Sequence, residues 1–205
     1  IYYSGQYVVR DILKAIFYFE LASENNVSDA LYALGYIYQY DFNSRDINKA
    51  IKYYTKAAKQ NHSDAQFQLG LIYYRPEYKM LNTDKAINYY MLAANQNNAD
   101  AQFMLGYLYL SGEYFSPNCS KSIHYFTLSA NQYHQKALYF LGIRYICGIG
   151  VERYITKGLN YLILSSEKYD HDAYMALGFI YQEGNYVERN VNKAISLLLM
   201  AEKQN

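Results

Sequence analysis

The chain has 205 residues, and its 19 lysine and arginine residues nearly balance its 18 aspartate and glutamate residues. This near-neutral balance, with no strongly basic stretch, argues against capture of a nucleic acid through its phosphate backbone. No apolar run reaches the roughly 18 to 20 residues that a membrane-spanning helix needs, so direct membrane insertion is not expected. The first residue is Ile1 rather than Met, so the lack of a leader sequence says little about the compartment.

A Leu-Gly pair recurs along the chain at a nearly constant interval. The pairs are Leu34-Gly35, Leu69-Gly70, Leu105-Gly106, Leu141-Gly142 and Leu177-Gly178, separated by 35, 36, 36 and 36 residues. A fixed period in this range is typical of stacked supersecondary units, which form a solenoid rather than a globule around one core. The regularity therefore predicts an array of repeats and favours a binding scaffold.

The chain opens in the middle of a repeat. Residues 14–22 carry the pattern of the second helix of a repeat, which we call helix B. The first helix of this repeat, if it existed, has been lost or degraded.

The first helix of each later repeat, helix A, begins near an Ala that is followed by Leu-Gly and then Tyr. These residues are Ala30, Ala65, Ala101, Ala137 and Ala173, with Tyr38, Tyr73, Tyr109, Tyr145 and Tyr181 eight residues after each. Ala, Leu and Tyr at this spacing share one helical face. A Gly in a helix costs about 1 kcal/mol relative to Ala, so its recurrence predicts close approach of another helix. Asp29, Asp64, Asp100 and Asp172 are the expected N-caps.

Helix B follows a loop that is rich in turn-forming residues. It begins at Ala50, Ala86, Ser122, Gly158 and Ala194, and continues with aromatic pairs such as Tyr53-Tyr54 and small pairs such as Ala57-Ala58. Small residues beside large ones at helical spacing allow two helices to interdigitate closely. Each unit is therefore expected to be a helical hairpin.

The columns resemble the Sel-one-like repeat, a relative of the tetratricopeptide repeat. The pattern A-x-x-x-L-G-x-x-Y, a Gly-rich loop such as Gly148-Ile149-Gly150, and Lys-Ala at the start of helix B carry the resemblance. The family favours Trp in helix B, whereas this chain has Tyr53, Tyr89, Tyr125 and Tyr161 there. The resulting prediction is an all-α fold, a right-handed α-solenoid of about five and a half helix-turn-helix repeats of 35–36 residues. It forms a single array over 1–205, with a partial repeat over 1–28 and repeats beginning near 29, 64, 100, 136 and 172.

The resemblance implies an adaptor that recruits a protein or peptide and can belong to a multiprotein complex. Relatives include the membrane-protein degradation machinery of the endoplasmic reticulum, and in some protists similar arrays follow protein kinase domains. The compartment is not fixed by the residues: the cytoplasm is preferred, and the lumen of the endoplasmic reticulum stays open.

The partner is expected on the inner surface that helix A usually lines in such arrays. The stripe opposite the core stripe comprises Tyr32, Tyr36, Gln39, Phe67, Leu71, Tyr74, Phe103, Tyr107, Leu110, Tyr139, Ile143, Ile146, Met175, Phe179 and Gln182. All of these except Tyr139, Ile146 and Met175, together with Arg144, form the predicted partner-binding set. Tyrosine gives a large contact area and a hydroxyl at little entropic cost. The positions two residues after Ala can instead pack between helices.

Arg144 stands in an otherwise apolar column, which reads Ile37, Ile72, Leu108 and Ile180 in the other repeats. It is either a partner contact or a locally solvated defect, and the second interpretation is preferred.

No residue pattern points to catalysis, a cofactor or a metal, and the chain is not expected to be an enzyme. His62, His134 and His171 lie near the turns between repeats, too far apart to share a metal ion, and no H-x-x-x-H or C-x-x-C spacing is present. Cys119 and Cys147 lie at equal distances along the chain from the turn at Tyr133, so a disulfide could join them. Two lone thiols are more often reduced and buried.

Three functional hypotheses follow. The leading one is an interaction scaffold that binds a peptide or a partner domain on the helix-A surface, with a degradation adaptor of the endoplasmic reticulum as a special case. The alternative is a structural subunit held in a larger assembly by its convex face and its uncapped ends. A reader of RNA is opposed by the aromatic stripe and the near-zero charge.

Overall fold

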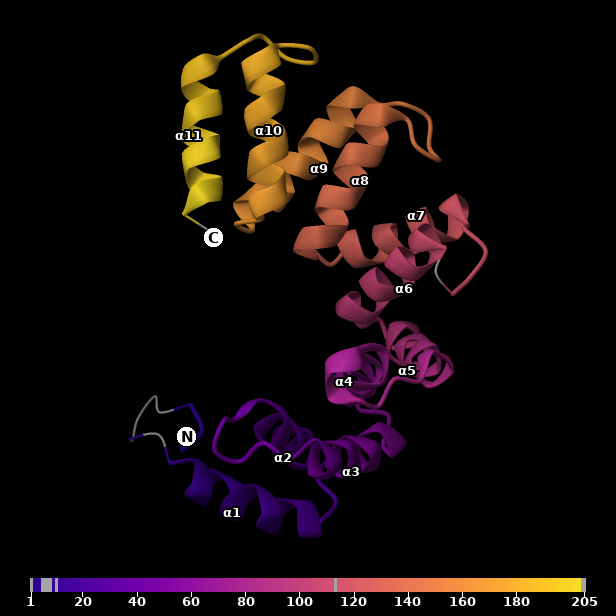
Figure 1. Cartoon of the computed structure of the whole chain (residues 1–205), viewed down its shortest axis with the longest axis vertical. Helices are drawn as coiled ribbons and strands as arrows, with labels where there is room; N and C mark the ends of the chain where they lie inside the picture. Colours follow the sequence, from indigo (N-terminus) through magenta and orange to yellow (C-terminus); the bar gives the residue numbers. More distant parts are fainter. Residues whose placement is uncertain (1, 5–8, 10, 113, 204–205) are drawn as a thin grey trace. The chain divides into compact units, whose positions relative to one another are not determined.

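In a computed structural model, residues 2–4, 9, 11–112 and 114–203 are described, and this part of the chain is all-helical, with eleven α-helices, one short 3-10 helix and no strand (Figure 1). None of these helices has the length and apolarity needed to cross a membrane. The chain divides into two compact units, Ile1–Asn98 and Ala99–Asn205. Each unit is a stack of helices in which consecutive helices pack side by side.

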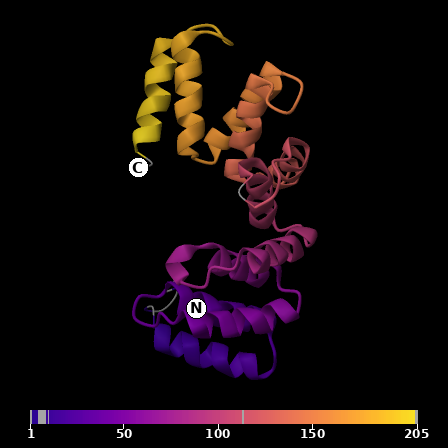
Figure 2. The ribbon, with the colours of Figure 1, turned by 45° about the vertical axis from the view of Figure 1, so that its right-hand side comes forward.

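The first unit contains three B helices and two A helices, stacked in alternation (Figure 2). The B helices are α1 (Ile12–Glu24), α3 (Ile47–Lys59) and α5 (Thr83–Asn95), and the A helices are α2 (Ser28–Tyr40) and α4 (Ser63–Tyr74). The short helix η1 (Pro76–Tyr78) lies in the loop between α4 and α5.

The second unit contains three hairpins. The A helices are α6 (Ala99–Ser111), α8 (Gln135–Cys147) and α10 (His171–Glu183), and the B helices are α7 (Cys119–Ala130), α9 (Ile155–Glu167) and α11 (Val191–Glu202). Figure 1 shows the last hairpin, α10 and α11, as two adjacent antiparallel helices. The predicted α-solenoid of helical hairpins is confirmed, including a B helix at the start of the chain.

The glycine of each Leu-Gly pair marks the closest approach between helix A and helix B. A Cβ atom built on Gly35 would lie 2.6 Å from the Tyr54 ring, and one on Gly106 would lie 2.7 Å from the Phe126 ring. The facing residues at all five positions are Tyr54, Tyr90, Phe126, Leu162 and Leu198. The first four of them are fully buried. The recurring glycine is therefore required because the large side chain of helix B occupies the space of its missing side chain, as the sequence predicted.

A lysine and two tyrosines form a second recurring contact at the other end of each hairpin except the last, where Lys193 lies over Tyr181 but Leu197 replaces the second tyrosine. In the second repeat Lys49 Nζ lies 4.9 Å from the centre of the Tyr38 ring, and Tyr38 stacks on Tyr53 at 5.7 Å. The same stack recurs as Lys85–Tyr73–Tyr89, Lys121–Tyr109–Tyr125 and Lys157–Tyr145–Tyr161. Cation–π and offset ring contacts each contribute of the order of 1 kcal/mol. The tyrosines that replace the tryptophan of the family pattern thus take part in this stack.

The first repeat keeps the same stack although the described residues before α1 form a turn, not a helix. Lys14 Nζ lies 5.6 Å from the centre of the Tyr2 ring, and Tyr2 stacks on Tyr18 at 5.6 Å. The Tyr2 carbonyl also accepts the backbone N–H of Asp11, as the Tyr38 carbonyl accepts that of Asp46. Tyr2 therefore occupies the position that the A-helix tyrosine has in the later repeats.

The predicted N-caps of the A helices are wrong by two residues. The four aspartates lie instead in the first turn of their helices: Asp29, Asp64, Asp100 and Asp172. A negative charge there is stabilised by the positive end of the helix dipole. Capping bonds come from residues further upstream: His62 Nδ1 accepts the N–H of Ala65, and His134 and Asp170 cap α8 and α10 in the same way. The first-turn aspartates are left to contact the neighbouring repeat.

The glycine contact gives a prediction about the sign of a stability change. On a helix with free space, Gly106→Ala would raise the free energy of unfolding by about 1 kcal/mol. The overlap with Phe126 instead predicts a lower free energy of unfolding, because the ring must shift within a packed core. Urea unfolding followed by circular dichroism measures the change, and a stabilised Gly106→Ala variant would contradict the assigned contact.

Tyr54 and Tyr90 are buried in equivalent positions, but we expect loss of the hydroxyl to change the free energy of unfolding differently at the two positions. The Tyr54 hydroxyl donates to Gln39 Oε1 at 2.8 Å, whereas the Tyr90 hydroxyl has no hydrogen-bond partner among the described residues. We expect Tyr54→Phe to lower the free energy of unfolding by about 1 kcal/mol and Tyr90→Phe to leave it unchanged or raise it. The phenylalanine at position 126 shows that this position accepts the ring without the hydroxyl.

The same pair predicts an effect of pH. Burial first, and nearby tyrosines second, raise the pKa values of Tyr54 and Tyr90 above the ordinary 10. The folded chain therefore keeps these hydroxyls neutral while the unfolded chain ionises them, so stability falls as the pH rises above about 10. Each Phe variant should flatten this alkaline loss, measured by urea unfolding between pH 8 and about 11. An unchanged slope in both variants would contradict it.

Candidate functional site

The A helices of the first unit present an aromatic surface. We call the outward side chains of the A helices the A surface; in this unit it comprises Tyr32, Tyr36, Tyr40, Phe67, Leu71 and Tyr74. The Tyr36 and Tyr40 rings lie 4.6 Å apart, and the Tyr40 hydroxyl donates to Gln68 Oε1 at 3.0 Å, which joins α2 to α4. A hollow of about 290 Å³ opens beside Tyr36 and is lined by Tyr3, Phe19, Tyr32, Ala33, Tyr36 and Ile37.

The A surface of the second unit is formed by Phe103, Tyr107, Leu110, Phe140, Ile143, Phe179 and Gln182. Tyr107 and Phe179 are its exposed aromatic side chains, with 38% and 49% of their area accessible. Gln182 is exposed as well, whereas Phe103, Leu110 and Ile143 are half-buried. Phe140 contacts Phe103 and Tyr107, with ring centres 5.9 and 6.4 Å apart, and thereby joins α8 to α6.

Tyr32, Phe67 and Phe103, two residues after the marker Ala, pack against rings of other helices and of the residue before the next A helix, as the packing interpretation expects. Tyr32 stacks on the His62 ring at 4.7 Å, and Phe103 stacks on His134 at 4.8 Å and also contacts Phe126. Phe67 likewise lies against Tyr90. These three rings are therefore the half-buried part of the A surface, packed against the helices behind it.

Two members of the predicted partner-binding set are buried and cannot present their side chains to a partner. Gln39 is 1% exposed, accepts from the Tyr54 hydroxyl and donates to the Tyr78 hydroxyl. Arg144 is 5% exposed, and its guanidinium donates to the carbonyl of Ile149 at 3.1 Å. Both interpretations of Arg144 are therefore wrong, because its side chain is neither exposed to a partner nor solvated. It is buried and hydrogen-bonded to the backbone of the loop after α8. Ile146, in the same stripe, is also buried.

Charged side chains are nearly absent from the A helices. Their charged residues are the first-turn residues Asp29, Asp64, Asp100, Lys136 and Asp172, the buried Arg144, and Glu183 at the end of α10. Every B helix carries a lysine in its first turn, and α3 carries three more. The middle of each A surface is therefore uncharged and rich in tyrosine and phenylalanine.

Sequence reasoning missed two members of the A surface, Tyr40 and Phe140. Tyr40 lies ten residues after its marker Ala, and Phe140 lies three residues after it. Neither position was in the stripe because the other repeats have Arg75, Ser111 and Cys147, or Ala33 and Gln68, in these columns. The helical position of each aromatic residue, considered without requiring a similar residue in the other repeats, could have identified them.

A polar contact links each A helix to the residue before the next A helix in the same unit. Asp29 Oδ1 lies 3.3 Å from His62 Nε2, and Asp100 Oδ1 lies 3.2 Å from His134 Nε2. Since the Nδ1 atoms of both histidines accept the capping N–H, their Nε2 atoms carry the hydrogen that faces the carboxylate. Asn98 Nδ2 donates to Asp64 Oδ1 at 2.8 Å in the equivalent place.

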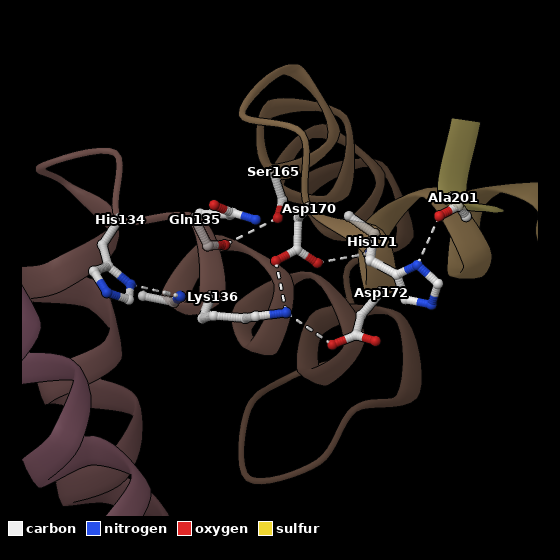
Figure 3. Close-up of polar contacts among 10 residues, drawn as sticks. His134, Gln135, Lys136, Ser165, Asp170, His171, Asp172 and Ala201 are labelled. Carbon is white, nitrogen blue, oxygen red and sulfur yellow. Dashed lines mark hydrogen bonds and ion pairs between the residues drawn. The ribbon is translucent and has the colours of Figure 1, made fainter. Parts of the chain in front are cut away.

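The charges of this contact are reversed between α8 and α10 (Figure 3). Lys136 Nζ lies 3.0 Å from Asp170 Oδ2 and 2.9 Å from Asp172 Oδ2. Asp170 is fully buried, and its Oδ1 accepts the capping N–H of Ala173. Desolvation lowers the pKa of Lys136, but the hydrogen bonds to Asp172 and Asp170 outweigh it and raise the pKa above its usual value. The contact is thus maintained by different chemistry in different repeats.

The described residues contain no cluster of His, Cys, Asp or Glu suited to a metal ion. Cys119 and Cys147 are free and exposed, so the disulfide left open by the sequence is not formed and the thiols are not buried. His171 makes different contacts from His62 and His134: its Nδ1 lies 2.9 Å from the carbonyl oxygen of Ala201. The A surfaces and the polar contacts between repeats are the features left to explain.

These observations define a helical-hairpin repeat protein, an α-solenoid. In each hairpin a glycine packs against a large side chain, and polar contacts at the helix N-termini join successive hairpins. Within this class, the chain belongs to the Sel1 repeat family, whose repeat model matches residues 1–27, 28–62, 63–98, 99–134, 135–170 and 171–205. This family generally mediates protein interactions. That the six segments behave as one continuous array stays a prediction.

Solved structures of the family share this fold. A Sel1 repeat protein from Oxalobacter formigenes is 28% identical with a TM-score of 0.93, and the match covers 100% of this chain and 84% of that protein. A protective antigen of uropathogenic Escherichia coli is 24% identical with a TM-score of 0.86, and this chain covers 44% of its length. An immunity protein from Pseudomonas aeruginosa is 20% identical over 91% of this chain and 73% of that protein, with a TM-score of 0.59. A search of curated proteins found no significant match.

The reversed contact predicts a double-mutant result. Lys136→Met leaves the buried Asp170 carboxylate without its cation, so we expect the free energy of unfolding to fall by roughly 2 kcal/mol. Asp172→Asn removes only the half-exposed partner and should cost well under about 1 kcal/mol.

Adding Asp170→Asn to Lys136→Met removes the unpaired charge and keeps an oxygen to cap Ala173, so most of the loss should return. Asn98 shows that an amide fits this column. Urea unfolding of the parent, Lys136→Met, Asp170→Asn and the double variant gives the coupling free energy between positions 136 and 170. Additive losses in the double variant would contradict the ion pair.

Proposed function

We propose that the chain is an interaction scaffold that binds an uncharged, apolar or aromatic segment of a protein partner on the A surface of Ala99–Asn205. The observation that carries this proposal is the segregation of charge. The exposed rings of Tyr107 and Phe179 lie on helices whose central residues carry no exposed charge, whereas every B helix carries a lysine and the one lysine of the A helices, Lys136, lies in a first turn.

The A surface has the composition that protein interfaces favour. Aromatic side chains are enriched at binding hot spots, and charged residues are depleted from the centre of an interface. The rings beneath it are fixed: Phe140 lies against Phe103, Tyr107 and the buried Phe126. A surface that is rigid before binding loses less conformational entropy on binding.

The partner segment is expected to be extended or helical and poor in acidic residues. Asp100 and Asp172 line the N-terminal edge of this surface and are exposed or half-exposed, although Lys136 stands between them. A segment with apolar side chains toward the rings and no carboxylate near this edge avoids like-charge contacts. In the first unit, the hollow of about 290 Å³ beside Tyr36 could take one apolar side chain of a partner.

We expect Tyr107→Ala and Phe179→Ala each to weaken binding of a partner peptide by about tenfold or more, because each removes an exposed ring from the A surface. Peptides selected from a display library against the whole chain supply the ligand, and fluorescence anisotropy measures the dissociation constant. Since both rings are exposed, the melting temperature should change by less than about 3 °C.

The matched controls are Ile163→Ala and Leu199→Ala, which remove apolar side chains that are 39% and 52% exposed on B helices of the same unit. These variants should bind as the parent does. Binding lost in the B-helix variants but kept in the A-surface variants would contradict the proposal and place the interaction on the convex side. The same four variants can be used to capture the native partner from lysate.

A further inference from the structure

Helix α1 differs from the other B helices on the face that they turn toward their A helix. The residue that meets the glycine of the Leu-Gly pair is fully buried in the next four repeats, whereas its counterpart Phe19 is only half-buried. Ala22 is half-buried too, although all five of its counterparts are fully buried. These counterparts are Ala57, Ala93, Ser129, Ser165 and Ala201. This face of α1 is therefore less covered than in the other repeats.

Two apolar hollows lie beside Phe19. The hollow of about 290 Å³ beside Tyr36 has Phe19 on its α1 side and residues of α2 on the other. A second hollow, of about 250 Å³, is lined by Tyr2, Tyr3, Ala15, Tyr18 and Phe19. Because Tyr3 and Phe19 line both, the two hollows form one groove with α1 as one wall and α2 as the other. We call it the α1–α2 groove; none of its lining residues is charged.

The counterparts of the α1 wall contact an A helix. In each of the five later repeats, the residue equivalent to Phe19 faces the glycine of the A helix in its own hairpin. At the position of Ala22, Ser129 Oγ donates to the carbonyl of Ala99, the first residue of α6. Ser165 makes the same bond to the first residue of α8. The stretch from Phe19 to Ala22 is thus the part of a B helix that an A helix covers, from its glycine to its first residue.

The α2 wall carries a matching contact from the other side. Ala33 lines the groove, and its counterpart on α4, Gln68, accepts the hydroxyl of Tyr40 from the A helix one repeat earlier. Phe140, in the same column on α8, likewise contacts two rings of the preceding A helix, α6. Both walls of the α1–α2 groove therefore consist of positions that contact an A helix in other repeats.

We propose that the α1–α2 groove binds an apolar α-helix of a partner protein, seated as the A helices are and with a glycine against the Phe19 ring. Phe19 leaves no room for a side chain there, as Tyr54 leaves none on Gly35. The bound helix continues an interface that the chain forms five times within itself, which favours a helix over an extended segment. Since the groove lining is uncharged, charged residues of the partner helix are expected only on its solvent side.

The probe is a fluorescein-labelled peptide with the sequence of α4, residues 63–74, and the whole chain is titrated into it while fluorescence anisotropy is measured. A short isolated helix is marginal in water, so binding should be weak but saturable. A Gly70→Leu peptide should bind at least about tenfold more weakly, because its side chain would overlap the Phe19 ring. The Phe19→Ala chain should reverse this order: it binds the glycine peptide more weakly and the leucine peptide more tightly than the parent chain does.

Phe17→Ala is the matched control. Phe17 is 61% exposed on the other side of α1, where α3 has Lys52, so this variant should bind the peptide as the parent does. Tyr107→Ala should also bind it normally, because Tyr107 lies on the A surface of the second unit. Failure of this proposal is therefore distinguishable from failure of the function proposed for that surface.

A fused helix tests the groove without removing any side chain. Residues 63–71 joined directly before Ile1 place Gly70 three residues before Tyr2, the spacing of Gly and Tyr in the later repeats. This helix should fill the groove and weaken peptide binding at least about tenfold. No binding to the parent chain, equal binding of the two peptides, or unchanged binding by the fused chain would overturn the proposal. A longer natural form of the chain that does not bind the peptide would overturn the partner as well, because its own helix would then fill the groove.

Discussion

The distance between helix A and helix B, set by a glycine facing a large buried side chain, is the constraint on which the other contacts depend. Tyr54 and Tyr90 occupy the volume that a side chain on Gly35 and Gly70 would need. With the hairpin closed this tightly, the A-helix tyrosine can stack on the B-helix tyrosine, and the lysine of the next turn can lie over that ring. The backbone bond from the residue before helix B to the Tyr38 carbonyl, and its equivalents, closes the same end. Because one close contact positions all the others, the hairpins can differ in sequence elsewhere and keep one geometry.

Stacking of successive hairpins follows a looser rule. The residue before the A helix must accept a capping N–H and also contact the first turn of the preceding A helix, and three chemistries meet both needs. His62 and His134 use one ring nitrogen for each task, Asn98 contacts Asp64 through its amide, and Asp170 uses one carboxylate oxygen for the cap and one for Lys136. The geometry is shared while the charge is reversed. This explains why the four histidines of the chain look scattered in sequence although two of them occupy equivalent places.

The sequence predicted features that repeat and missed features that do not. The α-solenoid, the hairpins and the close approach at glycine follow from columns that recur with one residue type, such as Gly106 opposite Phe126. The N-caps were misplaced because Asp is a common cap and stands near the helix start in four repeats, whereas the true column mixes His, Asn and Asp. Gln39 was placed on the surface by its column in the repeat and Arg144 by its charge, but each is buried with hydrogen bonds to groups from another element, Tyr54 and Ile149. Such pairings depend on the loop path, which no column of the repeat encodes.

The two sides of the hairpins have separate roles in this arrangement. The first-turn lysines of the B helices lie over tyrosine rings, and the carboxylates and histidines that contact the next repeat lie at the N-terminal ends of the A helices. The charged contacts that stabilise stacking are therefore at the ends of the A helices, and the bond from the Tyr40 hydroxyl to Gln68 is an uncharged contact on the A surface itself. Phe179 is consequently not needed to close a hairpin or to join two repeats, and Tyr107 takes part in joining them only through its edge contact with Phe140, unlike Tyr109 or Phe126, which close the hairpin in the same unit. Leu13 and Phe17 are dispensable for the fold in the same sense, since Asn48 and Lys52 serve in their place on α3. Exposed apolar side chains that the fold does not need are free to contact other molecules.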